Sequence, residues 1–467
     1  MEPSRTTTMT LVIEVPDTYR SEREYVLGHV LGARLGLSWS LRIVPGTRAV
    51  RITDAARSRS ITVSDGLFAL SEDRRLTKAA VPELPLTQRY VPGMSSTLPV
   101  LFGNGRSEEL VEFRHSEVRV NVDLFGGIFF MLTRLEEVIQ PARDGHGRFP
   151  DEQALLVKAG FDELPVADAY VELLWKAVSK AWPHLVRRST QYAVLPTHDV
   201  DRPSAYGERP WLRLRGIGGD LAKRKDPLLA VRRLGSMVPS KYRRVLDPYD
   251  TFDFLMRVSE RHGLRSAFFF MADRDRRSVD HPYRLSDAPL PHVLRRVQLG
   301  GHEVGLHTGY ASYTSAALIS QELERLQTAA RQAGVDQSWW GGRQHYLRWE
   351  NPSSWRAWRS AGLHYDSTIG HARRVGFRAG TCHPYEAFDV LERRPLGLIE
   401  VPLIVMDGAL YKQFASAEER LEAVRRLARG CRNYGGTLTI LWHNNSFLTV
   451  PRSWYEDMIS EAVGVGS

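Results

Sequence analysis

The chain has 467 residues, of which 43% are hydrophobic and 25% charged, and its formal net charge is +9. The length predicts two domains, and the composition is ordinary for a globular protein with a sizeable core. The only two cysteines, Cys382 and Cys431, exclude a disulfide framework and a cysteine-rich zinc site. Glu14 and Asp17 interrupt the N-terminal residues, which therefore form no apolar run as long as that of a signal peptide. No later window is an apolar run long enough to span a membrane. We therefore expect a cytoplasmic protein without a transmembrane segment.

The first 188 residues are predicted to form an α/β domain. The predicted strands are 10–15, 49–52 and 60–63, where β-branched residues alternate with polar ones, and the predicted helices are 22–35, 124–135 and 166–181. Asp123 stands directly before the second helix. A substrate contact is one interpretation of Asp123, but we favour a helix N-cap, which requires no function.

Residues 189–467 are predicted to form a second domain in which strands and helices alternate. Strands are expected at 192–195, 266–271 and 304–306, and amphipathic helices at 251–262, 290–297 and 319–333. This order predicts parallel strands with covering helices, and therefore an α/β fold.

A basic segment interrupts this domain at about residues 205–248. Between Trp211 and Val245 it carries ten Lys and Arg against two Asp. We interpret it as the solvated face of an inserted helix. Alternatively, it contacts the phosphate of a nucleotide-linked or lipid-linked sugar, or a peripheral anionic membrane surface. No nucleic-acid-binding motif accompanies the charge, so nucleic acid is not expected as a partner.

Polar clusters follow the predicted strands of the second domain. Asp199 and Asp201 end the first strand, and they share one face if the strand continues, because strand side chains alternate. Buried acids at a strand end are costly unless they are paired, metal-bound or catalytic, although Asp201 to Ser204 also fits a simple turn. Four further clusters follow at 301–308, 342–349, 365–382 and 437–445.

The order Asp-x-Asp, His307, Arg343, Asp366-Ser367 and Ile440-Leu441-Trp442-His443 resembles the polysaccharide deacetylases of carbohydrate esterase family 4. The resemblance covers roughly the last 270 residues and implies a distorted (β/α) barrel. The first half resembles the domain that often precedes such barrels in bacterial proteins, through residues 123–126, 134–137 and 147–150. That second resemblance implies no function.

The family resemblance implies catalytic roles for several residues. Asp199 would be the general base and His443 the general acid, with Arg343 orienting Asp199 and Asp366 orienting His443. Asp201 and His307 would bind a divalent metal, zinc in the first place and nickel or cobalt otherwise. Substrate contacts are expected from the polar and aromatic residues of the same clusters: Arg378, Trp349, Tyr346, Trp442 and His345.

Two departures from the family pattern leave the metal open. Val200 occupies the usual position of the second aspartate, and Ala311 occupies that of a second histidine ligand. The expected reaction is hydrolysis of an acyl group, in the first place N-acetyl, from an amino sugar or glycoconjugate. One alternative is a metal-free amidohydrolase acting on a non-sugar C–N bond, in which His307 and Arg343 polarise the carbonyl. Another is an inactive barrel that binds a glycan or acts as a scaffold.

Overall fold

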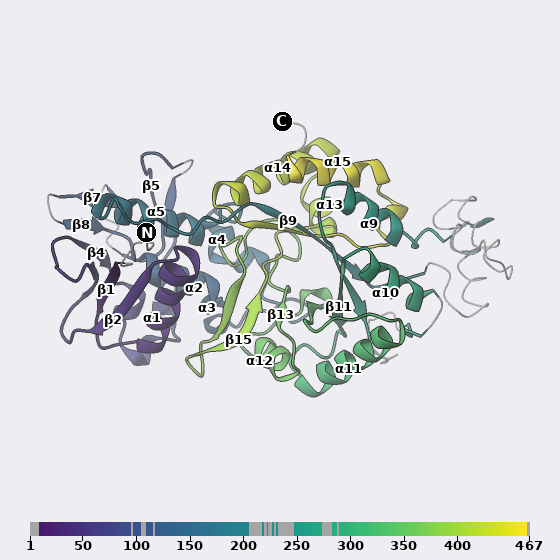
Figure 1. Cartoon of the computed structure of the whole chain (residues 1–467), viewed down its shortest axis with the longest axis horizontal. Helices are drawn as coiled ribbons and strands as arrows, with labels where there is room; N and C mark the ends of the chain where they lie inside the picture. The colour runs from purple at the N-terminus through teal and green to yellow at the C-terminus, as the bar shows by residue number, and fades with distance from the viewer. Residues whose placement is uncertain are drawn as a thin grey trace, which may run out of the picture.

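The computed structural model describes residues 9–94, 97–103, 109–114, 117–204, 217–218, 222, 227, 230–231, 247–272, 283–286 and 289–464. The basic segment predicted at about 205–248 therefore lies almost wholly outside the described residues. Two α/β portions lie side by side along the long axis of the molecule (Figure 1).

The N-terminal portion contains a six-stranded mixed sheet in the order β2-β1-β3-β4-β8-β7. Inward residues of β1 such as Leu11 and Ile13 are fully buried, as the alternating pattern predicts. The expected helix 22–35 is instead a short α-helix followed by a π-helical segment, Gly28–Arg34. The elements are β1 (Thr10–Val15), α1 (Arg20–Leu27), β2 (Ser38–Ile43), β3 (Ala49–Thr53), β4 (Ser60–Ser64), β5 (Thr87–Arg89), β6 (Leu98–Val100), β7 (Val111–Phe113), β8 (Glu117–Val120), α2 (Leu124–Leu132), α3 (Leu135–Ile139), α4 (Leu155–Lys158) and α5 (Val166–Ala181).

The second sheet has nine strands in the order β14-β15-β13-β12-β11-β10-β9-β17-β16. All neighbouring pairs are parallel except β14 with β15. The sheet curls with helices on its outer side and does not close (Figure 1), so the predicted α/β barrel-like fold is confirmed. Its strands are β9 (Ala193–Val200), β10 (Ala267–Met271), β11 (Glu303–Thr308), β12 (Gly341–Gln344), β13 (Tyr365–Asp366), β14 (Tyr385–Asp389), β15 (Arg394–Glu400), β16 (Val405–Met406) and β17 (Thr437–Leu441).

The helices around this sheet follow the apolar periodicity of the sequence. In α11, Ile319, Leu323 and Leu326 lie on the buried face, and α14 begins with a capping box formed by Ser416 and Glu419. The helices are α9 (Phe252–Arg261), α10 (Leu290–Leu299), α11 (Ala316–Gln332), α12 (Ser353–Ser360), α13 (Asp407–Gln413), α14 (Ala417–Asn433) and α15 (Arg452–Val463). Among the described helices, none is long and apolar enough to cross a bilayer.

Buried polar contacts join the two portions. Arg378 donates to both carboxylate oxygens of Glu137, at 3.0 and 2.7 Å, and Asn351 Nδ2 donates to the carbonyl of Thr133 at 2.7 Å. The portions are therefore connected through specific hydrogen bonds.

Asp123 is the N-cap of α2, as predicted, because its carboxylate accepts the backbone N–H of Gly126 at 2.8 Å.

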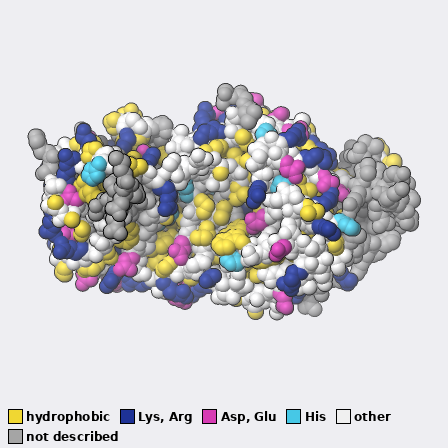
Figure 2. Space-filling model, in the orientation of Figure 1, with side chains coloured by type: hydrophobic (Ala, Val, Ile, Leu, Met, Phe, Trp, Pro, Cys, Tyr) yellow, Lys and Arg dark blue, Asp and Glu magenta, His cyan; other side chains and the backbone are white. Residues whose placement is uncertain are grey.

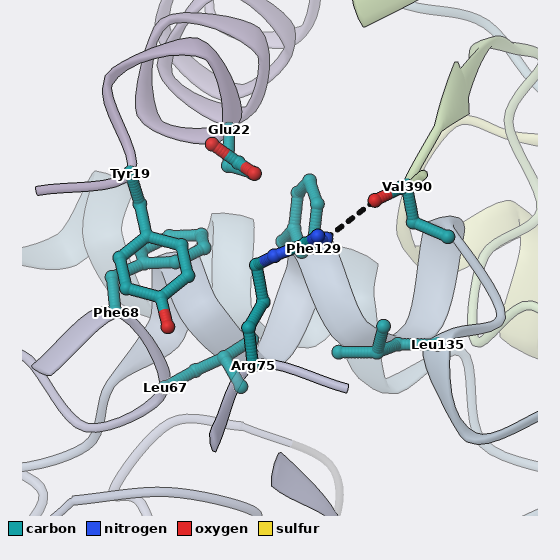
Figure 3. Close-up of a pocket in the computed structure, with 8 residues that line it drawn as sticks. All are labelled: Tyr19, Glu22, Leu67, Phe68, Arg75, Phe129, Leu135 and Val390. Atoms are coloured by element: carbon teal, nitrogen blue, oxygen red, sulfur yellow. Dashed lines mark hydrogen bonds between the residues drawn. The ribbon is translucent and has the colours of Figure 1, made fainter. Parts of the chain in front are cut away.

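A small cavity lies at the same junction (Figure 3). Its volume is about 10 Å³, and Arg75 crosses beside it to donate to the carbonyl of Val390. A cavity of this size holds about one water molecule. It is a packing gap between the two portions and is too small for a substrate.

The surface charge is mixed. On the face shown in Figure 2, Lys and Arg side chains are interspersed with Asp and Glu over both portions. The net charge of +9 is therefore not gathered into a single basic stripe on this face.

Candidate metal centre and acid–base site

The predicted site residues meet at one edge of the curled sheet. Strands β12, β11, β10, β9 and β17 are consecutive and parallel, so their carboxyl ends lie together. This edge carries Asp199 near the end of β9, Asp201 just after it, His307 in β11, His345 directly after β12 and His443 two residues after β17.

Asp201, His307 and His345 form a group with the donor set of a metal site. Asp201 Oδ1 lies 3.1 Å from His307 Nε2 and 3.7 Å from His345 Nε2, and one donor atom from each residue lies within 4.8 Å of the others. His307 Nδ1 lies 2.9 Å from the carbonyl oxygen of Arg343. Because a carbonyl can only accept, this contact assigns the proton of a neutral ring to Nδ1 and leaves the Nε2 lone pair facing Asp201.

Two buried atoms of this group lie 3.1 Å apart, yet neither makes a hydrogen bond to any described residue, and a metal ion would explain this. Within the described part of the chain, Asp201 Oδ1 and His307 Nε2 are buried and make no hydrogen bond. Burial alone would raise the pKa of Asp201, but the contacts with His307, His443 and His345 outweigh burial and hold it well below its usual range. One carboxylate and two imidazoles are a donor set that fits zinc or a similar divalent ion.

His345 supplies the second histidine that the sequence pattern lacks at Ala311. The sequence predicts a substrate contact for His345. The structure instead places His345 within coordinating reach of Asp201, with its ring centroid 5.0 Å from that of His307. Arg343 and His345 are two residues apart, so an extended backbone sends both side chains to the same side.

Arg343 is fully buried and holds Asp199 in place. Its Nη1 donates to Asp199 Oδ1 and to Thr197 Oγ1, both at 2.9 Å, while its Nε and Nη2 donate to the carbonyl and hydroxyl oxygens of Ser367. The other oxygen of Asp199, Oδ2, lies 3.8 Å from His307 Nε2. This geometry supports the predicted positioning role. Arg343 is buried and each of its nitrogens donates to a protein acceptor, so its guanidinium is engaged in holding Asp199 and its neighbours.

Two glycines explain how β12 brings Arg343 there. A Cβ on Gly342 would lie 1.8 Å from the carbonyl oxygen of Leu306, and one on Gly341 would lie 2.1 Å from the ring of Tyr365. Only glycine permits this close approach to the neighbouring strands.

His443 forms a dyad with Asp407, not with Asp366. His443 Nδ1 lies 2.8 Å from Asp407 Oδ1, and the backbone N–H of His443 donates to Asp407 Oδ2 at 2.9 Å. Burial alone would lower the pKa of His443, but the nearby Asp407 carboxylate outweighs burial and raises it to about 10. His443 Nε2 points to the metal-ligand group, 3.8 Å from Asp201 Oδ2. The ring is therefore arranged to carry and deliver a proton.

The predicted contact of Asp366 with His443 is wrong. Asp366 is fully buried in β13, accepts the hydroxyl of Thr368, and stands beside Glu400 in the register of β13 and β15. Burial raises the pKa of Asp366 to about 7 and that of Glu400 well above its usual range. These two acids lie in the sheet interior rather than on His443.

Three predicted substrate contacts are also corrected. Trp349 and Trp442 are buried, the first against Trp355 and the second against Trp454 and other rings, so they fill the core. Arg378 is 5% exposed, and its guanidinium donates to Glu137 and to the carbonyl of Gly370. Of the predicted contacts, Tyr346 keeps an exposed side chain next to the site, with its ring 4.5 Å from that of His345.

Two further histidines of this domain, His198 and His302, have structural contacts. His198 is fully buried, with Nδ1 2.9 Å from the carbonyl of Trp442, and packs on Phe268. His302 accepts the backbone N–H of Ser266 through Nδ1, at 3.0 Å. Both have contacts that explain their positions without a metal.

A second group with metal-ligating atoms, Asp168, Cys382 and His383, does not fit a cation. The carboxylate of Asp168 pairs with Arg34 and accepts the hydroxyl of Thr381 and the backbone N–H and thiol of Cys382. Burial raises the pKa of the Cys382 thiol well above its usual range. A guanidinium on the carboxylate and a protonated thiol both disfavour metal binding, and they make Cys382 a poor nucleophile.

One family model matches the N-terminal portion of the chain. Residues 11–183 match the model of a family of unknown function, DUF7033. Among solved structures, the chain is similar to a presumed polysaccharide deacetylase from Mycobacterium smegmatis, with 18% identity and a TM-score of 0.38, over 60% of this chain and 86% of that chain. It is also similar to a polysaccharide deacetylase from Bacillus cereus, with 12% identity and a TM-score of 0.25, over 59% and 86%. A further similarity is to a CE4-family pseudoenzyme from Bacillus anthracis, with 10% identity and a TM-score of 0.28, over 60% and 62%. A search of the curated proteins found no match.

Proposed function

We propose that the protein is a metal-dependent hydrolase that removes an acyl group, in the first place N-acetyl, from an amino sugar in a glycan or glycoconjugate. The observation that carries the proposal is the meeting of a fixed carboxylate, a three-residue metal-ligand group and a charged histidine at one edge of the sheet. The order of the motifs along the chain, which resembles the carbohydrate esterases, supports the same reaction.

The geometry supports the following proposed roles. Asp201, His307 and His345 would hold a divalent metal, whose Lewis acidity stabilises the negative charge that develops on the acyl oxygen. Asp199, held through Oδ1 by Arg343, would accept the proton of the attacking water through Oδ2.

On the leaving-group side, His443 would give its Nε2 proton to the departing amine nitrogen. Asp407 stabilises the charged ring through Nδ1 before that transfer. His307 and His443 approach the Asp201 carboxylate at different oxygens, Oδ1 and Oδ2. If the protein is cytoplasmic, a biosynthetic precursor or small conjugate is a better substrate than a cell-wall polymer.

Metal analysis is the first test. The protein would be purified without chelator or histidine tag and its metal content determined for wild type, His345→Ala and the matched control His292→Ala, which removes an exposed histidine on α10. Near-stoichiometric metal in wild type and control, lost in His345→Ala, is the expected result. Acetate release from N-acetylated amino sugars should then require both the metal and Asp199.

Two results would change the conclusion. Absence of metal after reconstitution with zinc, cobalt or nickel would overturn the metal-dependent mechanism and favour a metal-free hydrolase or a binding barrel. Bound metal with turnover of another C–N bond, but none of N-acetyl sugars, would overturn the substrate class.

A further inference from the structure

The backbone after the metal-ligand candidate His345 has a conformation that its residues disfavour. Tyr346 has φ 60° and ψ 12°, and Leu347 has φ 52°, so two consecutive bulky residues are left-handed. Such residues persist there only where surrounding contacts determine the conformation, and they concentrate at functional sites. Leu347 is buried against Leu403 and Leu441, which accounts for one side of the turn.

A loop from the N-terminal portion holds the other side. In residues 144–148, the Asp144 carboxylate accepts the backbone N–H groups of His146 and Arg148, at 2.8 and 3.0 Å. The same carboxylate accepts Arg148 Nε at 2.9 Å and Nη2 at 2.7 Å. Arg148 is thereby fixed, and its remaining Nη1 donates to the carbonyl oxygen of Tyr346 at 2.8 Å.

A second guanidinium crosses in the opposite direction. Arg348 Nε donates to the carbonyl of His146 at 2.7 Å, and its guanidinium lies 4.1 Å from the ring centroid of Tyr310. The His146 ring is 4.6 Å from that of Tyr346. The loop and the segment after β12 are therefore joined through two arginines and a ring contact, directly beside His345.

We propose that the loop 144–148 positions His345 as a metal ligand, with Arg148 as the positioning residue. The inference rests on the metal site of the proposed function. It assigns a role to the segment that matches the family of unknown function, because the loop lies within residues 11–183. Arg148 holds the carbonyl that follows His345, and the left-handed turn then directs the imidazole to Asp201.

The test compares Arg148→Ala with Arg143→Ala in the full chain. Arg143 is exposed in the same loop region, and among the described residues it donates to carbonyls of its own portion, those of Gln140, Ala142 and Glu137. Zinc affinity would be measured by competition with a chromophoric chelator, and the ligand geometry by the visible absorption of bound Co²⁺. Loss of a partner that orients a ligand typically weakens metal binding by about 10- to 100-fold. We expect that loss, with altered Co²⁺ bands, for Arg148→Ala and wild-type behaviour for Arg143→Ala.

The outcomes separate the inference from the proposed function. Wild-type protein that binds no metal overturns both. Tight wild-type binding with unchanged affinity and Co²⁺ spectrum in Arg148→Ala overturns the inference and leaves the metal site standing. If circular dichroism shows that Arg148→Ala does not fold, Asp144→Asn replaces it as the test, because it weakens the hydrogen bonds that hold Arg148. A loss of zinc affinity in Asp144→Asn, smaller than that expected for Arg148→Ala, supports the inference. An unchanged zinc affinity overturns it.

Discussion

The buried pair of Arg343 and Asp199 offers the sharpest test of the site's energetics. Arg343 is 0% exposed and Asp199 2% exposed, and they meet at 2.9 Å. Arg343→Met keeps much of the side-chain volume but leaves the Asp199 charge without its cation. Removal of one partner of a buried ion pair costs about 3–5 kcal/mol.

The double variant Asp199→Asn/Arg343→Met should be more stable than Arg343→Met alone. It removes both charges, and replacement of a whole buried pair by neutral groups is far less costly than breaking it, so we expect a recovery of about 2 kcal/mol or more. Calorimetry of the metal-free proteins should show this order in their melting temperatures, with a shift of roughly 2 °C for each kcal/mol in a domain of this size.

The control is Arg261→Met, whose arginine is 60% exposed in a surface pair with Glu456 and should cost at most about 1 kcal/mol. Turnover should be lost in Arg343→Met and should not return in the double variant, because the base is absent there. A double variant that melts at or below Arg343→Met would refute the view that Arg343 compensates the charge of Asp199.

Three further predictions concern the acid and the contact between the portions. Burial alone would lower the pKa of His443, but the Asp407 carboxylate outweighs this effect and the pKa is raised. Asp407→Asn should therefore move the alkaline limb of the pH–rate profile to lower pH, and an unmoved limb would exclude His443 as the acid. In the metal-free wild type, the raised pKa of His443 contributes stability that is fully present below its unfolded pKa of about 6.5 and is lost as the pH rises towards 10. The Tm should therefore fall over this pH range, and the fall should be smaller in Asp407→Asn. Arg378→Met should lower stability by about 3 kcal/mol, because it breaks the buried contact with Glu137, while KM stays unchanged. A raised KM at wild-type stability would restore the substrate role first predicted for Arg378.

Much of the site could be predicted because its residues follow strands. Polar residues that end parallel strands meet at one edge of a sheet, so Asp199, Asp201 and His307 come together whatever the loops between them do. The alternation of apolar strands and amphipathic helices likewise determined the curled α/β sheet. These are local patterns with a direct spatial consequence.

The corrected residues depend on information that is not local. Asp407 reaches His443 only because β16 pairs with β17, and the two residues are 36 positions apart. The signal for Asp407 was weak: one acid after a short apolar run. Trp442 was ambiguous because strands buried on both faces read as continuous apolar runs, so the sequence does not say which aromatic is exposed. For His345 the sequence does carry a signal, its spacing of two residues from Arg343, whereas the family pattern expects the ligand at position 311.

The supporting contacts favour the proposed catalytic arrangement over a binding barrel. A barrel that only binds a glycan or scaffolds a complex needs no particular orientation for a carboxylate and an imidazole. Here Asp199 is fixed by a fully hydrogen-bonded arginine, and His443 is fixed by a carboxylate that contacts both its ring and its backbone. The atom of each side chain that these contacts leave open faces the candidate metal ligands. Asp199 Oδ2 lies 3.8 Å from His307 Nε2, and His443 Nε2 lies 3.8 Å from Asp201 Oδ2. Buried charges held in this way are costly, and proton transfer is the chemistry that needs them so closely oriented.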